Sequence, residues 1–252
     1  MSSAPLQTLE AGDLARRISD FVQKRTWNDS DDVIAVLLAG DEPSPEKHVH
    51  LAESYCVLVA RHSPGASASQ AAELSREYSG SGTFASVTKT GIVALIPRRA
   101  QQRTVEHFQQ RLGGSLIAGV ATRTRAGIPS GYREASQILD LAHATRRPPG
   151  VYRLENFLVE YAVIRHAFVS GSLASIVARL MTTQPVLYET LEALVRADFN
   201  RNDTAQNLFV HRSTLDYRIA RIAQMTGQDP MSRRGAQVLR AALVAHTLAR
   251  EP

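Results

Sequence analysis

The sequence has little that would point to a disulfide framework, a metal site or a membrane span. Cys56 is the only cysteine among 252 residues, which excludes an internal disulfide and a cysteine-based metal site. The eight histidines are scattered, so we predict no metal and no other cofactor. A charged leader is absent, as is any stretch approaching about 18 uninterrupted apolar residues. We therefore expect a cytoplasmic protein without membrane contact.

The chain also has few lysines, which are Lys24, Lys47 and Lys89. Its formal net charge of +5 therefore rests on arginine, and so small a charge argues against sequence-independent coating of a polyanion. Residues 186–252 carry nine arginines against seven carboxylates, a net charge of +2. Basic side chains must gather on one face of this region if it is to attract DNA.

Residues 203–224 have the spacing of two short helices joined by a tight turn, a helix-turn-helix. Ala205 supplies the small side chain that a close helix crossing needs. Asn202 or Asp203 is suited to cap the first helix. Three apolar residues are expected to supply its buried end and the turn: Leu208, Phe209 and Val210.

The second helix of this pair is predicted to begin near His211 or Arg212. Its apolar residues Leu215, Ile219 and Ile222 lie four and then three positions apart, so they should face the core. The opposite side is then free to enter the major groove of double-stranded DNA. Arginine offers a planar fork of donors to guanine or phosphate, and hydroxyl groups suit base edges and phosphates. The expected DNA-contacting residues are Arg212, Ser213, Thr214, Asp216, Tyr217, Arg218 and Arg221.

Alternatives stand beside this interpretation. An ordinary pair of packed helices has the same apolar spacing, but the coincidence of pattern and basic face favours DNA binding. Asp216 can accept from a cytosine amino group or pair with Arg212 four residues earlier, and we favour the pair. His211 is suited to a DNA contact, but at the turn we expect it to cap the second helix.

The run LFVHRSTLDYRIARIAQMTGQD at 208–229 resembles the C-terminal helix-turn-helix of PucR/CdaR-type bacterial transcriptional regulators. Members of that family read TA, then LFVHRNTL, YR and a TG followed by D. The matching positions here are Thr204, Ala205, Leu208, Phe209, Val210, His211, Arg212, Thr214, Leu215, Tyr217, Arg218, Thr226, Gly227 and Asp229. Two positions depart from the family: Ser213 replaces the usual Asn, and Asp216 stands where a basic or polar residue is common. Because both lie on the expected DNA face, the operator sequence does not follow from the family.

The preceding region alternates short apolar runs with helical patterns. Strands are expected at 54–62, at 83–97 as a hairpin about Lys89 to Gly91, and at 114–122, with helices at 67–78, 100–112 and 129–144. This order predicts an α/β sandwich with a mainly antiparallel sheet. Further helices are expected at 12–26, with Leu14, Ile18 and Phe21 on one face, at 33–40 and at 45–53. Segment 33–40 is also compatible with a strand, but the polar residues before it and Gly40 favour a helix.

Residues 54–147 resemble the degenerate GGDEF-like domain of PucR/CdaR-type proteins. Active cyclases of that fold hold a divalent metal with carboxylates on the first strand and on a hairpin. Here the first strand ends in Ala60, Arg61 and His62, and the hairpin centres on Lys89. The sequence therefore predicts that this domain is not an enzyme.

Arg146 to Gly150, RRPPG, should end the α/β region because consecutive prolines forbid a continued helix. A long helix is expected after it, broken at Gly171, followed by helices at 173–181, 186–198 and 235–249. We expect an α+β protein with four segments: N-terminal helices at 1–53, the GGDEF-like domain at 54–150, linker helices at 151–185 and the helix-turn-helix domain at 186–252.

The sequence as a whole predicts a DNA-binding transcriptional regulator whose α/β domain transmits a signal or assembles. A homodimer or higher homo-oligomer is expected, because one helix-turn-helix has a small footprint. The apolar face of 12–26 is a candidate association surface. A small-molecule effector of unknown chemistry stays open. The alternatives are an adaptor that uses the helix pair for protein contacts, and a nucleotide-cyclase-like enzyme.

Overall fold

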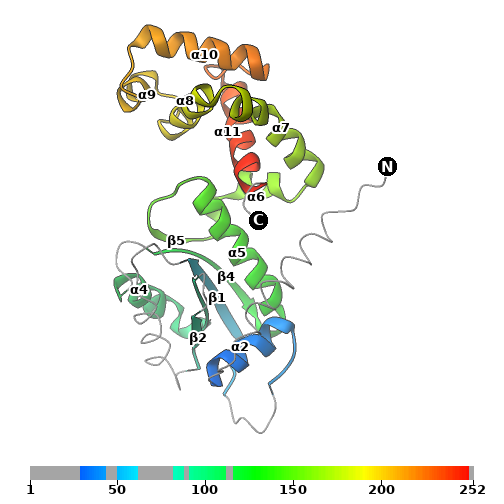
Figure 1. Cartoon of the computed structure of the whole chain (residues 1–252). Coiled ribbons are helices and arrows are strands. Elements are labelled where there is room, and N and C mark those ends of the chain that lie inside the picture. Colours follow the sequence, from blue (N-terminus) through cyan, green and yellow to red (C-terminus); the bar gives the residue numbers. More distant parts are fainter. Residues whose placement is uncertain (1–28, 44–49, 62–81, 88–90, 112–115, 250–252) are drawn as a thin grey trace. The chain divides into compact units, whose positions relative to one another are not determined.

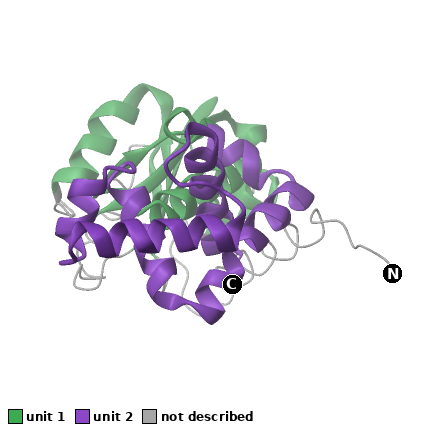
Figure 2. Cartoon of the chain, turned by 90° about the horizontal axis from the view of Figure 1, so that it is seen from above, with its two compact units in different colours: residues 1–158 green, residues 159–252 purple. Residues whose placement is uncertain are grey.

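The computed structural model describes residues 29–43, 50–61, 82–87, 91–111 and 116–249. The chain divides into two compact units, Met1–Leu158 and Val159–Pro252, which Figure 2 colours separately. The helices expected at 12–26 and 67–78, and the turn at Lys89, lie outside the described residues. Of the helix expected at 45–53, residues 50–53 are described and are not helical.

The first unit is built on a five-stranded sheet in the order β2-β3-β1-β4-β5. Figure 1 labels β1, β2, β4 and β5 of this sheet. The strands are β1 (Ser54–Arg61), β2 (Phe84–Val87), β3 (Gly91–Pro97), β4 (Ile117–Thr124) and β5 (Gly150–Tyr152). All neighbouring strands are antiparallel except β4 and β5, which are parallel. The mainly antiparallel sheet and the α+β class expected from the sequence are confirmed.

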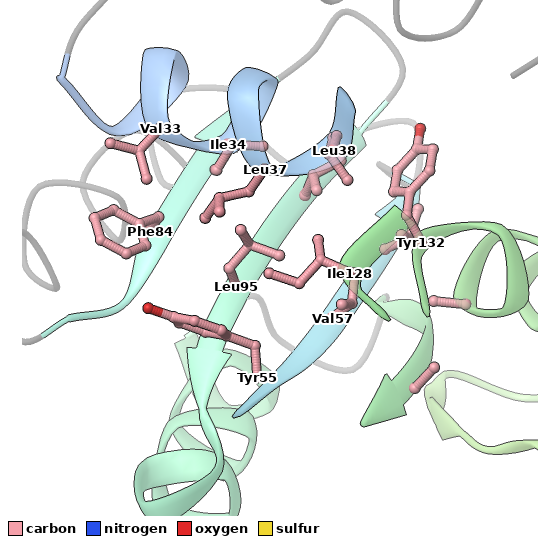
Figure 3. Packing of buried hydrophobic residues seen from close by; sticks show 14 of the residues in the cluster. Val33, Ile34, Leu37, Leu38, Tyr55, Val57, Phe84, Leu95, Ile128 and Tyr132 are labelled. Carbon is pink, nitrogen blue, oxygen red and sulfur yellow. The ribbon is translucent and has the colours of Figure 1, made fainter. Parts of the chain in front are cut away.

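Helices cover both faces of this sheet. On one face, α2 (Asp29–Ala39) and α5 (Ile128–Ala144) pack against Tyr55 and Val57 of β1 (Figure 3). On the other face, α4 (Gln101–Arg111) brings Phe108 onto Cys56 and Leu58. Successive residues of a strand point to opposite faces, so a strand covered on both faces must be apolar throughout. This is why SYCVLVAR has no polar alternation.

The region after α5 differs from the sequence expectation. Gly150–Tyr152 forms strand β5, which pairs with β4, and α6 (Leu158–Ile164) and α7 (Ala167–Thr183) follow. The helix breaks at Arg165 and His166 instead of at Gly171, which lies inside α7. The break has a backbone cause, because His166 is extended, with φ −114° and ψ 102°. Among the described residues no single helix is long and apolar enough to cross a membrane; α6 and α7 reach that length together, but the chain bends by 102° between them.

The second unit is all helical. After α6 and α7 come α8 (Pro185–Arg196), α9 (Arg201–Asn207), α10 (Arg212–Thr226) and α11 (Arg233–Leu248). Their shared core contains Val177, Leu180, Leu187, Leu191, Leu194, Leu215, Ile219, Ile222, Leu239, Ala242 and Leu243. Helix α7 packs along α11, and α7 and α8 support α10. The helix pair expected at 203–224 is thus α9 and α10, held on a core of its own.

Candidate nucleic-acid interface

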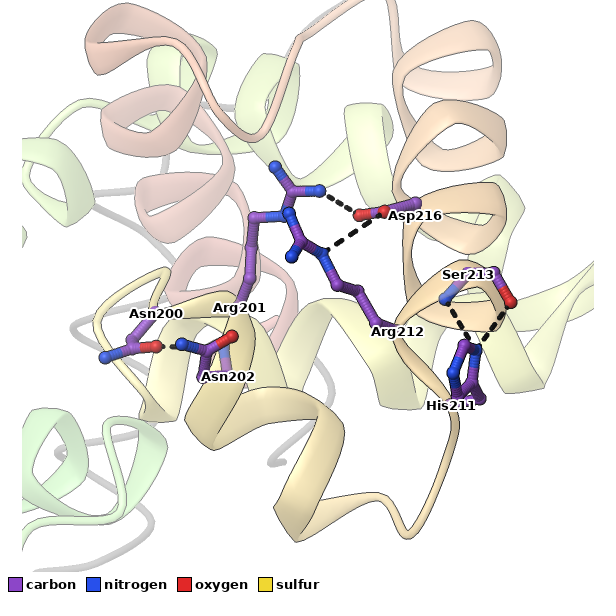
Figure 4. A network of polar contacts seen from close by, with 7 residues as sticks. All are labelled: Asn200, Arg201, Asn202, His211, Arg212, Ser213 and Asp216. Atoms are coloured by element: carbon purple, nitrogen blue, oxygen red, sulfur yellow. Dashed lines mark hydrogen bonds and ion pairs between the residues drawn. The ribbon is translucent and has the colours of Figure 1, made fainter.

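The N-cap of helix α9 is Asn200, two or three residues before the predicted caps Asn202 and Asp203. The Oδ1 atom of Asn200 accepts a hydrogen bond from the backbone N–H of Asn202 at 2.9 Å (Figure 4). It also accepts from the backbone N–H of Asp203 at 3.3 Å. Asn202 and Asp203 are therefore the capped residues, not the caps. Asn200 has the extended backbone of an N-cap, with φ −73° and ψ 115°.

The turn after α9 closes with two backbone hydrogen bonds. Phe209 N–H donates to Gln206 C=O (3.1 Å), and Val210 N–H donates to Ala205 C=O (3.0 Å). This is the Schellman arrangement, whose final turn residue is left-handed. Phe209 occupies that place, with φ +54°.

Of the three apolar side chains predicted to be buried at the turn, two pack against the core and one is exposed. Leu208 and Val210 pack against the core, as does Ala205 at the helix crossing. Phe209 is 97% exposed. Its predicted burial is wrong, because the left-handed backbone that ends α9 turns this side chain outward.

Helix α10 begins at Arg212, after the cap that the sequence predicted. The Nδ1 atom of His211 accepts from the backbone N–H of Ser213 at 3.3 Å and lies 2.8 Å from the Ser213 hydroxyl (Figure 4). In that role Nδ1 is an acceptor, so neutral His211 carries its proton on Nε2. His211 thus holds the first turn of α10.

The two faces of α10 separate as predicted. Leu215, Ile219 and Ile222 are all buried in the core of the unit. The expected contact residues that are exposed lie on the rest of the helix: Arg212, Ser213, Thr214, Tyr217 and Arg221. A rigid core face therefore positions a row of exposed donors and hydroxyl groups.

Asp216 ties α10 to α9. One of its carboxylate oxygens accepts from Nη2 of Arg201, and the other lies 4.0 Å from Nε of Arg212 (Figure 4). The predicted pair with Arg212 is present, but Arg201 of α9 is the closer partner. Sequence reasoning missed Arg201, because a residue 15 positions away carries no periodic signal.

Arg218 and Arg221 are engaged within the unit. Arg218 is partly buried, and its Nη1 donates to the hydroxyl of Thr190 on α8 at 3.3 Å. Nη1 of Arg221 donates to Oε1 of Gln224 at 2.8 Å, along the surface of α10. Arg221 is accordingly more accessible to a partner than Arg218.

The residues that close α10 have structural roles. The Thr226 hydroxyl donates to Ile222 C=O (2.8 Å), and Gly227 is left-handed with φ +68°. A carboxylate oxygen of Asp229 accepts from the backbone N–H of Met231 at 2.9 Å. This explains why threonine, glycine and aspartate stand at this spacing after the second helix.

In the first unit, the end of β1 is where a cyclase-type metal site would lie. Arg61 there donates to Oδ1 of Asp140 on α5 at 2.5 Å. A guanidinium has only hydrogen-bond donors, so Arg61 cannot ligate a divalent cation, and it already engages the carboxylate of Asp140. The part of the chain that the structure describes contains no group of three or more metal-ligating side chains.

A short capped helix, a tight turn and a second helix with an exposed polar face define the class of the second unit: it is a helix-turn-helix domain. Comparison with known families agrees. Residues 187–245 match the PucR C-terminal helix-turn-helix domain, and residues 48–141 match the GGDEF-like domain. The chain thus matches both domain models, and the resemblance found in its sequence is confirmed.

Several relatives share parts of the chain. Uncharacterised proteins of Mycobacterium tuberculosis and Mycobacterium bovis are 30% identical over 169 residues, which is 65% of this chain and 40% of each relative. The chain therefore spans less than half the length of these relatives. The transcriptional activator PmfR of Paenarthrobacter nicotinovorans is 43% identical over 63 residues, 24% of this chain and 13% of that protein.

A solved structure is also similar. The regulator of polyketide synthase expression from Bifidobacterium adolescentis is 21% identical, with a TM-score of 0.38, over 93% of this chain and 99% of that one.

Proposed function

We propose that the chain is a transcriptional regulator that binds double-stranded DNA with α10 in the major groove. One observation carries the proposal: α10 buries Leu215, Ile219 and Ile222 while a row of polar side chains stays exposed. A recognition helix needs this division, since its core face fixes its orientation and its free face contacts bases and phosphates.

The exposed residues have distinct roles in this proposal. Arg212, 73% exposed at its side chain and in the first turn of α10, is suited to a bidentate contact with guanine. Ser213 and Thr214 contact base edges or phosphate through their hydroxyl groups. Tyr217, which is 65% exposed, and Arg221 contact the DNA backbone. Arg218 joins them if its guanidinium leaves Thr190.

Asp216 has a structural role in this proposal. Its carboxylate already contacts Arg201 and lies 4.0 Å from Arg212, so we assign it to holding α10 against α9 and not to a cytosine amino group. It also places a negative charge on the face that approaches phosphates, which weakens binding that is not sequence-specific.

The first unit, in this proposal, has no catalytic role and transmits a signal or assembles the protein. The pair of Arg61 with Asp140 supports this, because it places at the end of β1 a side chain that cannot ligate a metal. We further propose a cytoplasmic homodimer or higher homo-oligomer. Two-fold pairing sets recognition helices about 34 Å apart, so that each reads a successive major groove.

The test is the affinity of the purified chain for a DNA site found by genomic footprinting. Replacing Arg212 by Ala is expected to weaken binding by about 1 to 3 kcal/mol, the value of a bidentate base contact. Arg179→Ala is the matched control, since it removes the same charge from an exposed position on α7. Equal affinities of the wild type and Arg212→Ala would defeat the assignment of Arg212.

An adaptor that uses the helix pair for protein contacts makes the opposite prediction about salt. A DNA-binding protein that contacts several phosphates loses affinity steeply as salt rises, with a log–log slope near −0.9 per contact. An adaptor shows no salt-dependent affinity for DNA.

A further inference from the structure

Phe209 combines two properties that each cost stability. Its backbone is left-handed, with φ +54°, where the side chain of an L-residue crowds the following carbonyl. Phe209 is 97% exposed to solvent, so its side chain gains no stabilisation from burial of apolar surface. Glycine is the usual residue at this place in a Schellman turn, since it lacks the steric penalty. Folding alone therefore gives no reason for a phenylalanine here.

In a second phenylalanine of the same unit, packing offsets the cost of a left-handed backbone. Phe199, three residues after α8 ends at Arg196, is also left-handed, with φ +61°. Its side chain packs against the core of the unit, and the guanidinium carbon of Arg240 lies 5.6 Å from the centre of its ring. Phe199 thus regains in packing what its backbone loses. Phe209 has no such contact with the core.

The position of Phe209 relative to α10 indicates a partner. It stands two residues before the cap His211 and three before Arg212, where α10 begins. The side chains exposed around it are polar: Gln206 and Asn207 on α9, and His211, Arg212 and Ser213 after it. An apolar ring surrounded by hydrogen-bonding groups is suited to a partner surface that offers both apolar contacts and hydrogen bonds. The edge of a DNA major groove is such a surface, because thymine methyl groups and deoxyribose lie between base edges and phosphates.

We propose that Phe209 is a DNA-contact residue whose ring packs against a thymine methyl group at the edge of the major groove. Phe209 thereby adds a preference for thymine that the guanidinium and hydroxyl groups of α10 do not supply, because the thymine methyl group is read by an apolar contact. The proposal rests on the proposed function, since it requires α10 to lie in the groove. In this proposal the phenylalanine is kept in the turn, despite its cost in stability, because it contributes to recognition of DNA.

The experiment compares wild type and Phe209→Gly on the footprinted operator, with each thymine replaced in turn by deoxyuridine, which lacks only the methyl group. For the wild type, one replacement is expected to weaken binding about fourfold, the factor for one methylene-sized group removed from water. For Phe209→Gly the same replacement is expected to have no effect. Phe209→Asn also lacks the ring, and asparagine tolerates the left-handed backbone. It is expected to behave like Phe209→Gly, which would show that the effect comes from loss of the ring and not from the flexibility of glycine in the turn.

Two further measurements separate this proposal from the proposed function. Thermal unfolding of Phe209→Gly is expected at or above the wild-type temperature, and the salt slope of its DNA affinity is expected to be unchanged, because no phosphate contact is lost. Wild-type affinity of Phe209→Gly for the operator, or deoxyuridine effects equal in wild type and variant, would overturn the role of Phe209 and leave DNA binding by α10 standing. Failure of the wild type to bind any DNA would instead defeat the proposed function.

Discussion

Replacing Asp216 by Asn changes the electrostatics of α10 with the smallest change of shape. The carboxylate interacts with Arg201 of α9 and with Arg212. In Asp216→Asn the net charge of residues 186–252 rises from +2 to +3. We expect a small loss of stability and a gain in DNA affinity.

The exposure of the pair bounds the loss of stability, and Coulomb's law gives the size of the gain in affinity. The side chains of Arg201 and Asp216 are 41% and 40% exposed, so solvent screens the pair and its loss costs no more than about 1 kcal/mol. A unit charge roughly 7 Å from one phosphate is repelled by about 0.6 kcal/mol in water. With two phosphates near the helix, removal of the charge gains about 1 kcal/mol, roughly fivefold in Kd.

The assay is fluorescence anisotropy of labelled operator and of unrelated DNA over a range of salt. Asp216→Asn is expected to bind both DNAs more tightly. If a freed arginine reaches a phosphate, the log–log salt slope becomes steeper by about 0.9. Glu189→Gln is the matched control, since it removes one negative charge from an exposed position on α8, and it should change affinity less. Weaker binding of Asp216→Asn to the operator alone would refute the structural role of Asp216 and favour a contact with cytosine.

Two predictions concern the cores of the units. Leu215 is fully buried, so Leu215→Asp should unfold the second unit by leaving a charge without a partner in its core; a normal melt in circular dichroism would show that the core face of α10 is wrong. Cys56 is fully buried, and burial raises the pKa of its thiol to about 11, so a thiol reagent at neutral pH should label it only on unfolding. It should stay protected in Leu215→Asp, and rapid labelling of that variant would show that the two units do not fold separately.

The core face of α10 could be predicted because its signal is local. Spacings of four and three residues between Leu215, Ile219 and Ile222 need no knowledge of their partners. The cap at His211 is local too. Strand β1 could be predicted for a related reason, since its apolar run exceeds what a strand with one exposed face would carry.

The errors arose where a tertiary contact or an exact backbone angle decides the outcome. Phe209 was expected to be buried because it is apolar, but its backbone turns it to solvent. The partners of Asp216 and Arg218 depend on where α9 and α8 lie, which no spacing within α10 reveals. Strand β5 has only three residues, too few for a period, and exists because β4 offers it an edge.

Whether the second unit binds DNA through α10 is decided by the salt dependence of its affinity for a footprinted site. Purified protein should protect a discrete genomic site, and its affinity for that site should fall linearly with salt on a log–log scale, by about 0.9 per phosphate contact. The absence of a discrete footprint, or an affinity that salt does not change, would contradict DNA binding through α10.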